Sequence, residues 1–219
     1  PLGLRLPATS RLDNFVAGAN REVVAVVREL LHAEAPGVVF LAGAAGSGKT
    51  HLLQAACRAI EANGARAAYL PLAELVAHTP GLLEGLEQYR LVACDDVQAI
   101  AGRADWEEAM FHLYNRLREA GGLLIGAATQ PPERLGLELP DLRSRLAWGG
   151  VYALQPPDDA VRLEILTVHA RERGLELPAE TAQFLLRRCP RDLHALIDLL
   201  DRLDRAALRA QRRLTVPFV

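Results

Sequence analysis

Apolar residues recur with two different periods along the first 155 residues of the chain. Short continuous apolar runs are typical of buried strands, whereas apolar residues at every third or fourth position are typical of helices. The two patterns alternate, which predicts an α/β fold with a parallel sheet covered by helices on both faces. The expected strands cover residues 38–42, 67–70, 91–94, 123–127 and 151–154, and the expected helices cover about 20–34, 49–61, 71–77, 82–88, 105–118 and 142–147. Asn20 is the expected N-cap of the first helix.

The pattern changes at Gln155-Pro156-Pro157. The residues that follow contain only helical periods, over about 158–173, 178–188 and 191–212, which predict a small three-helix lid. Consecutive prolines break regular structure, so they are expected to mark a hinge. The first nine residues are mostly apolar but show no helical period. We therefore expect three parts, over residues 1–9, 10–155 and 156–219.

The bulk composition excludes several classes of function. The chain has 219 residues and a formal net charge of −2, whereas dedicated nucleic-acid binders usually carry an excess of basic residues. No apolar run approaches the roughly 18 residues of a membrane span. Cys57, Cys94 and Cys189 fit no metal or redox spacing, which favours a reducing compartment. We therefore expect a cytoplasmic protein without a membrane segment and without direct sequence-specific DNA binding.

A glycine-rich motif follows the first expected strand and opens the next expected helix. It matches G-x4-G-K-[ST] in full and consists of Gly43, Ala44, Ala45, Gly46, Ser47, Gly48, Lys49 and Thr50. Such a loop turns backbone N–H groups toward phosphate oxygens at a helix N-terminus. Its lysine contacts the β and γ phosphates, and its hydroxyl binds Mg²⁺. Lys49 is the only lysine among 25 basic residues, which indicates that arginine cannot replace it there. His51 is grouped with these expected nucleotide-binding residues.

Two carboxylates, Asp95 and Asp96, follow the apolar run 91–94. At the carboxyl end of a parallel strand, Asp95 can hold Mg²⁺ through its water shell. Asp96 is then placed to orient or deprotonate an attacking water. Many strands also end in acidic residues that serve only a turn, so this structural alternative stays open.

Two further polar positions carry candidate chemistry. Thr129 closes the next core strand, where a polar side chain can sense the γ-phosphate, although a turn-forming threonine before Pro131-Pro132 explains it equally well. Arg143 and Arg145 lie just before the last expected strand. An arginine at this place would face a neighbouring subunit and stabilise charge on its transferring phosphoryl group. A solvated arginine is the alternative.

Together these residues resemble the ATPase module of the bacterial replication initiator DnaA, an AAA+ family, over nearly the whole chain. Residues 13–20 resemble the family's D-N-F-V-x-G-x-x-N box, which implies that Phe15 and Val16 frame an adenine. Residues 95–102 resemble its D-D-I-Q-x-x-A-G segment, and residues 142–149 resemble its L-x-S-R-x-x-W-G box. The likeness of residues 142–149 implies that Arg145 is an arginine finger. The resemblance implies a P-loop AAA+ α/β domain with a small all-helical lid, and ADP or ATP with Mg²⁺ as ligands.

Three segments, over residues 106–116, 139–142 and 210–219, resemble the Hda group of regulatory inactivators of DnaA more closely. No helix-turn-helix pattern follows the lid, in agreement with that group. Hda proteins begin with a Q-L-x-L-x-L peptide that docks on the DNA polymerase sliding clamp. Pro1-Leu2-Gly3-Leu4 resembles its second half, which implies Leu2 and Leu4 as clamp-binding residues, although the leading Gln-Leu is missing. A disordered apolar tail is the alternative.

Two departures from the family concern phosphate sensing. Relatives carry a sensor-2 arginine in the lid where this chain has His194, and Arg191 lies one helical turn earlier as a candidate substitute. The sensor-1 segment 128–132 lacks the acidic residue of relatives. We therefore expect weak ATP hydrolysis by the chain itself and a preference for bound ADP.

Three functions follow from this reading. The leading one is a regulator of replication initiation that, with the sliding clamp, promotes hydrolysis of DnaA-bound ATP through Arg145. The second is an autonomous ATPase or helicase loader, which would need Asp96 as its water-activating group. The third is the isolated ATPase domain of an initiator. The expected partners are DnaA and the sliding clamp, and a homodimer is left open.

Overall fold

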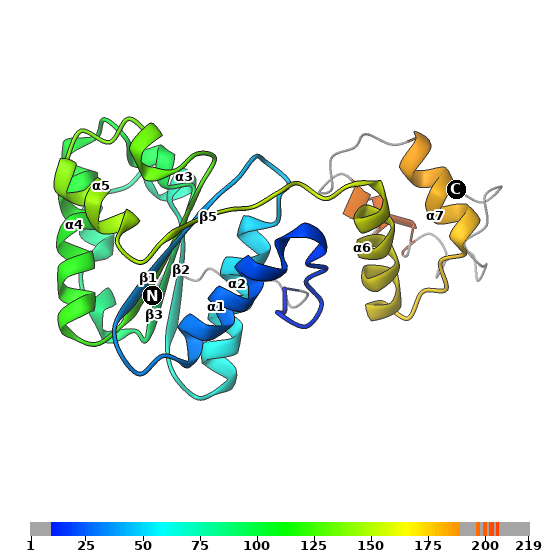
Figure 1. Ribbon diagram of the computed structural model, residues 1–219, viewed down its shortest axis with the longest axis horizontal. Coiled ribbons are helices and arrows are strands. Elements are labelled where there is room, and N and C mark those ends of the chain that lie inside the picture. The colour runs from blue at the N-terminus through cyan, green and yellow to red at the C-terminus, as the bar shows by residue number, and fades with distance from the viewer. Residues whose placement is uncertain (1–9, 189–195, 198, 201, 204, 206–219) are drawn as a thin grey trace. The chain divides into compact units, whose positions relative to one another are not determined.

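The computed structural model describes residues 10–188, 196, 197, 199, 200, 202, 203 and 205 (Figure 1). These residues form two compact units. Residues 10–13 and Asn20–Pro156 make up the first unit, called the body below. Asn14–Ala19 belongs with the described residues from Pro157 onward in the second unit, called the lid below. The chain therefore crosses between the units after Asp13, after Ala19 and after Pro156.

The body is built on one five-stranded sheet with the order β2-β3-β4-β1-β5, in which every pair is parallel, as predicted. The strands are β1 (Gly37–Ala42), β2 (Ala67–Pro71), β3 (Leu91–Asp95), β4 (Leu123–Ala128) and β5 (Val151–Ala153). The strands β3 and β4 are buried along their whole length, which is why they consist of continuous apolar runs. Because all strands run in one direction, the loops after β1, β3 and β4 meet at one edge of the sheet.

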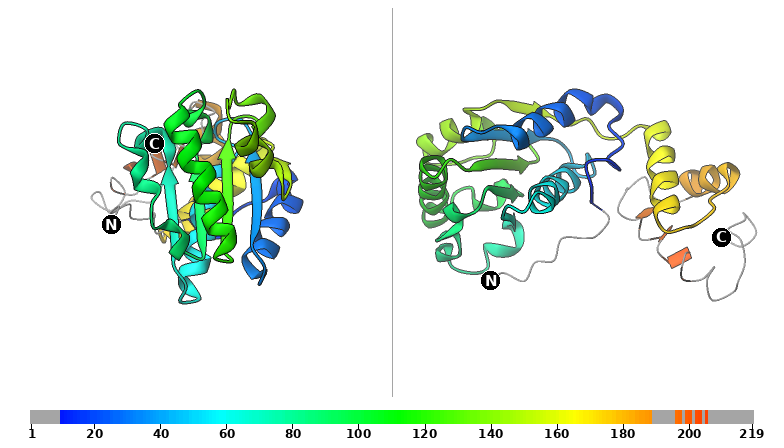
Figure 2. Two further views of the ribbon diagram at one scale, coloured as in Figure 1. Left: turned by 90° about the vertical axis from the view of Figure 1, so that its left-hand side faces the viewer. Right: turned by 90° about the horizontal axis from the view of Figure 1, so that it is seen from below.

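Helices cover both faces of the sheet (Figures 1 and 2). On one face lie α1 (Arg21–His32) and α2 (Lys49–Ala62), and on the other lie α4 (Ala104–Glu119) and α5 (Pro140–Ala147). The connections contain α3 (Leu72–Leu75) and 3-10 helices at Gly18–Asn20, Pro80–Leu83, Leu86–Gln88, Val97–Ile100 and Pro132–Arg134. In the lid, α6 (Asp159–Glu172) and α7 (Ala179–Arg188) contact each other. The predicted fold class is confirmed.

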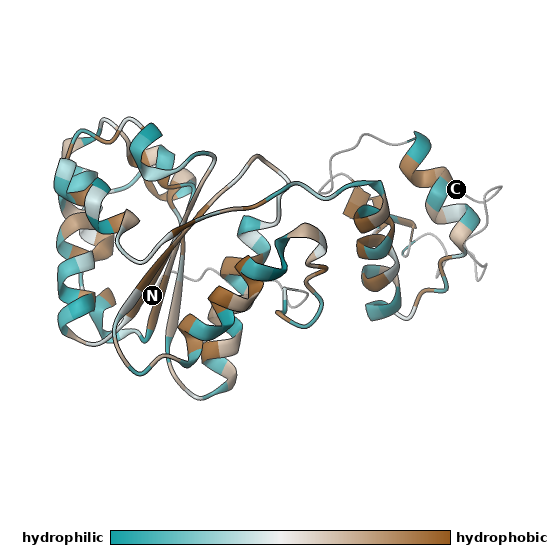
Figure 3. Cartoon of the chain, viewed as in Figure 1, coloured by the Kyte–Doolittle hydropathy of each residue, from teal (hydrophilic) through white to brown (hydrophobic). Residues whose placement is uncertain are grey.

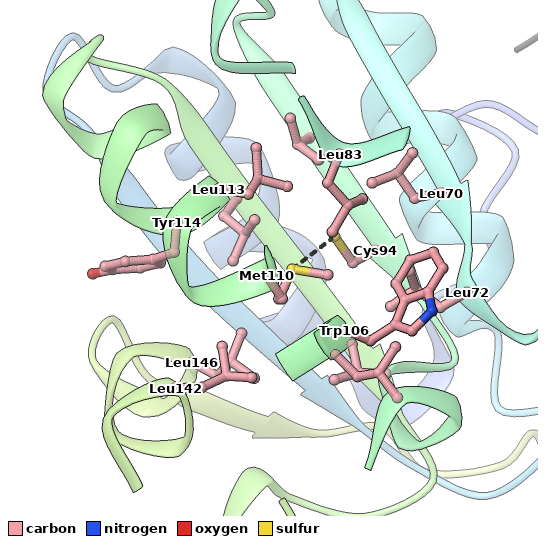
Figure 4. Close-up of a cluster of buried hydrophobic side chains, with 14 of the residues drawn as sticks. Leu70, Leu72, Leu83, Cys94, Trp106, Met110, Leu113, Tyr114, Leu142 and Leu146 are labelled. Atoms are coloured by element: carbon pink, nitrogen blue, oxygen red, sulfur yellow. Dashed lines mark hydrogen bonds between the residues drawn. The ribbon is translucent and has the colours of Figure 1, made fainter. Parts of the chain in front are cut away.

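One hydrophobic core cluster lies between the sheet and the helices α4 and α5. Trp106, Met110 and Leu113 of α4 are each 1% exposed or less and pack with Leu142 and Leu146 of α5 and with residues of β2 and β3 (Figure 4). The strands are correspondingly apolar, whereas the surrounding helices alternate between apolar and polar residues (Figure 3). Burial of this apolar surface holds α4 and α5 against the sheet.

Several local expectations differ from the structure. Asn20 precedes α1 but makes no capping hydrogen bond; its side chain bonds to the backbone of Gln155 instead. Residues 82–88 form parts of two 3-10 helices rather than one helix, because Gly85 has a φ of +77°, outside the helical range. The expected helix 71–77 is limited to one turn, α3. Most of the expected helix 191–212 lies outside the described residues.

Two further findings bear on the class of protein. Within the part of the chain that the structure describes, every helix is too short or too polar to span a bilayer. Cys57 and Cys94 are free and buried, and Cys189 lies outside the described residues. Burial raises the pKa of the Cys94 thiol to about 12, so this thiol stays protonated at neutral pH.

Candidate nucleotide-binding site

The glycine-rich loop joins β1 to α2, as the motif predicts, and its backbone geometry requires glycine. Gly46 and Gly48 have φ angles of +75° and +97°, which residues with a side chain rarely adopt. A Cβ on Gly43 would lie 2.7 Å from the Leu154 carbonyl oxygen and 2.7 Å from Ser47 Oγ. The N-cap residue, Gly48, has no side chain with which to cap α2, so the first N–H groups of this 14-residue helix are available to a ligand. This geometry fits a bound phosphate.

Two polar side chains of the loop, those of Ser47 and Lys49, form no hydrogen bond to a charged group among the described residues. Ser47 Oγ is buried and has no hydrogen-bond partner among the described residues. Lys49 Nζ donates to the carbonyl oxygens of Gly43 at 2.7 Å and Ala44 at 2.9 Å. Burial lowers the pKa of Lys49, while the nearby Asp95 and Asp96 carboxylates partly oppose that shift. An anion in the loop would give the ammonium a charged partner in place of two neutral carbonyls.

Asp95 ends β3 and lies next to the loop, as predicted. It is 2% exposed, and its Oδ2 accepts hydrogen bonds from Thr50 Oγ1 at 2.6 Å and from Tyr69 OH at 2.9 Å. Its Oδ1 accepts from the backbone N–H of Asp96 at 3.0 Å. Thr50 and Asp95 are therefore brought together from separate parts of the sequence. One hydroxyl and one carboxylate fit Mg²⁺, which usually keeps several waters and takes few protein ligands beside the substrate phosphates.

Tyr69 was not among the predicted site residues. It pairs with Ala93 in the β2–β3 register, so Tyr69 and Asp95 are diagonal neighbours on one face of the sheet. Burial and the adjacent Asp95 carboxylate raise the pKa of Tyr69 far above its usual value, so the hydroxyl remains a donor. Tyr69 could have been identified as a site residue only from the register between β2 and β3, because this register places it next to Asp95.

Asp96 and Thr129 lie in the turns that follow neighbouring strands, and Gln98 connects them. Asp96 has a φ of +54°, the only positive φ outside glycine among the described residues. Gln98 Nε2 donates to Asp96 Oδ1 at 2.8 Å, and Gln98 Oε1 accepts from the Thr129 backbone N–H at 3.3 Å. The side chain of Gln98 thereby holds one carboxylate oxygen of Asp96. Gln98, like Tyr69, was not among the predicted site residues. Thr129 itself is exposed.

Arg145 lies on α5, and the chain that follows this helix passes close to the start of β1. The chain leaves α5 at Ala147, and a Cβ on Gly149 would lie 1.8 Å from the carbonyl oxygen of Val38 near the start of β1. The P-loop begins at Gly43, five residues farther along this strand (38 to 43), or about 17 Å at 3.3 Å per residue. The Arg145 guanidinium is 5.9 Å from the Tyr114 ring centroid. It forms no ion pair within the described ranges.

The remaining predicted site residues lie outside the glycine-rich motif 43–50. Phe15 and Val16 belong to the lid, in the segment Asn14–Ala19. His51 lies on the first turn of α2, where its Nε2 is 3.1 Å from the Arg11 carbonyl oxygen. Leu2, Leu4, Arg191 and His194 lie outside the described residues. Their roles stay predictions.

Comparison with known proteins agrees with this architecture. A family model described as the bacterial DnaA ATPase domain matches residues 6–153, and a model described as the Hda lid domain matches residues 159–219. Domain III of DnaA from Thermotoga maritima has a TM-score of 0.82 at 24% identity, covering 98% of this chain and 95% of that one, which shows the fold.

Two other solved structures extend the comparison. AMPPCP-bound DnaA from Aquifex aeolicus has a TM-score of 0.71 at 28% identity, covering 94% of this chain and 71% of that one. The RuvB Holliday junction branch migration motor of Thermotoga maritima shares the fold, with a TM-score of 0.72 at 20% identity over 97% of this chain and 70% of that one. The chain belongs to the bacterial DnaA ATPase domain family, and its C-terminal part matches the Hda lid domain.

Proposed function

We propose that this chain is a regulator of bacterial replication initiation that promotes the hydrolysis of ATP bound to DnaA. In this proposal, Arg145 acts in trans as an arginine finger, and the sliding clamp recruits the chain through Leu2 and Leu4. The chain itself binds an adenine nucleotide, ADP in preference to ATP, with Mg²⁺. Membership of the DnaA family and the Hda-type lid support the regulatory role.

Arg145 supports the proposal because it forms no ion pair within the described residues. Its guanidinium lies 5.9 Å from the centroid of the Tyr114 ring. A guanidinium without an acidic partner in the described part of its own chain is suited to phosphates held by another subunit. A guanidinium there would stabilise the charge that develops on the transferring phosphoryl group.

The chain's own site supports nucleotide binding more directly than hydrolysis. The P-loop amides and Lys49 would hold the phosphates, and Thr50 and Asp95 would hold Mg²⁺, which neutralises phosphate charge when bound. Asp96 would orient a water, with its Oδ1 already engaged by Gln98. A stably bound ADP would fix the conformation in which the chain meets DnaA.

The finger role is tested with ATP-bound DnaA, DNA loaded with the sliding clamp, and this chain. We expect Arg145→Ala to lower the stimulated rate of ATP hydrolysis on the order of 10³-fold, because a finger contributes mainly to the transition state. Arg143→Ala is the matched control, since it removes the same group from the same helix. Full stimulation by Arg145→Ala, with Arg143→Ala equally active, would rule out the finger role.

A second candidate function is an autonomous ATPase. Two observations favour it: Thr50 donates a hydrogen bond to Asp95, and Gln98 donates one to Asp96. This alternative predicts substantial steady-state turnover by the isolated protein. That turnover should be lost in Asp96→Asn, which has a similar shape but a far weaker base. Negligible turnover by the wild-type protein would leave the regulatory proposal as the better account.

A further inference from the structure

The segment Asn14–Ala19 belongs to the lid, although the residues on both sides of it in the sequence belong to the body. It leaves the body after Asp13 and returns at Asn20, which is 7% exposed and bonds to the backbone of Gln155. The contacts of the segment with α6 therefore make it part of the lid. This matters because the segment contains Phe15 and Val16, the residues expected to contact the base of the nucleotide.

One of these contacts is a hydrogen bond at the carboxyl end of α6. Asn14 Nδ2 donates to Glu172 Oε1 at 2.6 Å, across 158 positions of sequence. Glu172 is the last residue of α6, and its other carboxylate oxygen is 3.7 Å from His169 Nδ1 on the same helix. The acceptor for Asn14 is a carboxylate, which makes a stronger hydrogen bond than a neutral acceptor.

A second contact lies near the amino end of α6. Gly18 has a φ of +52°, and a Cβ at this position would lie 2.8 Å from Val161 Cγ2. The backbone of the segment thus lies directly against the helix at a place where only glycine fits. Val161 and Glu172 are 11 residues apart (161 to 172), or about 16 Å along the helix. Three residues separate Asn14 from Gly18, and the two contacts show that the segment runs along α6 in the opposite direction to the helix.

We propose that Glu172 is a positioning residue for recognition of the base. Its hydrogen bond to Asn14 and the contact between Gly18 and Val161 hold the segment Asn14–Ala19 against α6. Glu172 then acts on affinity for the base, whereas the residues of the P-loop act on affinity for phosphate. A change in α6 should alter affinity for the base without altering affinity for phosphate. This inference rests on the proposed binding of an adenine nucleotide.

The test compares two ligands, ADP and inorganic pyrophosphate, each titrated with Mg²⁺ by calorimetry. We expect Glu172→Ala to weaken ADP binding about threefold to tenfold, the range for loss of one hydrogen bond, with pyrophosphate binding unchanged. Glu172→Gln should bind ADP like the wild-type protein, because its amide oxygen can accept the same hydrogen bond from Asn14. Glu164→Ala is the matched control, since Glu164 is an exposed residue of the same helix.

A double-mutant cycle makes the test specific to the contact. If Asn14 and Glu172 act through each other, the variant with both Asn14→Ala and Glu172→Ala should bind ADP no more weakly than either single variant. Unchanged ADP binding by Glu172→Ala, or an equal loss for ADP and pyrophosphate, would overturn the inference alone. A wild-type protein that binds neither ligand would contradict the proposed function, and the inference would fall with it.

Discussion

At the carboxyl edge of the sheet, the charge of Asp95 is offset by donors from three separate places in the chain. Thr50 donates from α2, Tyr69 from β2, and the backbone of Asp96 from the turn that follows β3. A carboxylate that is 2% exposed needs such donors, because burial without them would cost several kcal/mol. The Tyr69 hydroxyl thus supports the residue expected to hold Mg²⁺.

We predict that Tyr69→Phe lowers the free energy of unfolding by about 2 kcal/mol in the presence of EDTA, the usual value for a hydrogen bond to a charged group. The loss should be smaller with Mg²⁺ and ADP, since the cation compensates the charge that Tyr69 no longer offsets. Urea unfolding under both conditions measures the difference. The control is Tyr152→Phe, which removes a hydroxyl from β5. Equal losses in both conditions would contradict a role at the metal site.

Among the elements, α5 is important because it carries Arg145, and its start is fixed by a buried carboxylate. Glu107 on α4 is 1% exposed and accepts hydrogen bonds from three backbone N–H groups. Its Oε1 accepts from Gly102 at 2.8 Å and Glu138 at 3.1 Å, and its Oε2 accepts from Leu139 at 2.7 Å. Leu139 is the N-cap residue of α5, so Glu107 sets where this helix begins.

We predict that Glu107→Gln destabilises the protein by about 1–3 kcal/mol, because an amide NH₂ would face the Leu139 N–H where an acceptor is required. Thermal unfolding measures the change. The adjacent Glu108→Gln serves as the control, since Glu108 is 73% exposed on its side chain and pairs only with His112. If the two variants unfolded at the same temperature, Glu107 would not be the group that fixes α5.

At the scale of the whole molecule, the Asn20 side chain joins two body segments that each lie next to a place where the chain crosses between body and lid. Asn20 Nδ2 donates to the Gln155 carbonyl oxygen at 2.9 Å, and Asn20 Oδ1 accepts from the Gln155 N–H at 2.8 Å. Asn20 follows the crossing at Ala19, and Gln155 precedes the crossing at Pro156. One amide therefore joins chain segments that are 135 positions apart.

We predict that Asn20→Asp lowers the free energy of unfolding by about 1–3 kcal/mol, because a carboxylate oxygen would replace the donor that faces the Gln155 carbonyl. Cleavage near residues 154–158 in limited proteolysis should also become faster. Asn63→Asp, at an exposed position after α2, makes the same chemical change without that partner. Unchanged stability and unchanged proteolysis in Asn20→Asp would show that this connection is unimportant.

The sequence alone determined the features that depend on neighbouring residues. The periods of apolar residues predicted all five strands and the main helices, since each element forms according to its own pattern. The P-loop motif was readable because its glycines, Lys49 and Thr50 are contiguous. Asp95 and Asp96, at the end of β3, were readable because a parallel sheet puts the ends of its strands at one edge.

Only the tertiary structure decided which distant side chains support those residues. Tyr69 bonds to Asp95 because of one strand register, and Gln98 connects two turns that follow neighbouring strands. Asn20 looked like a helix cap, yet its amide bonds to Gln155, and the adjacent segment with Phe15 and Val16 belongs to the lid. Apart from the local bond between Gln98 and Asp96, these contacts join residues far apart in the chain, so no local pattern encodes them, and packing selects each partner.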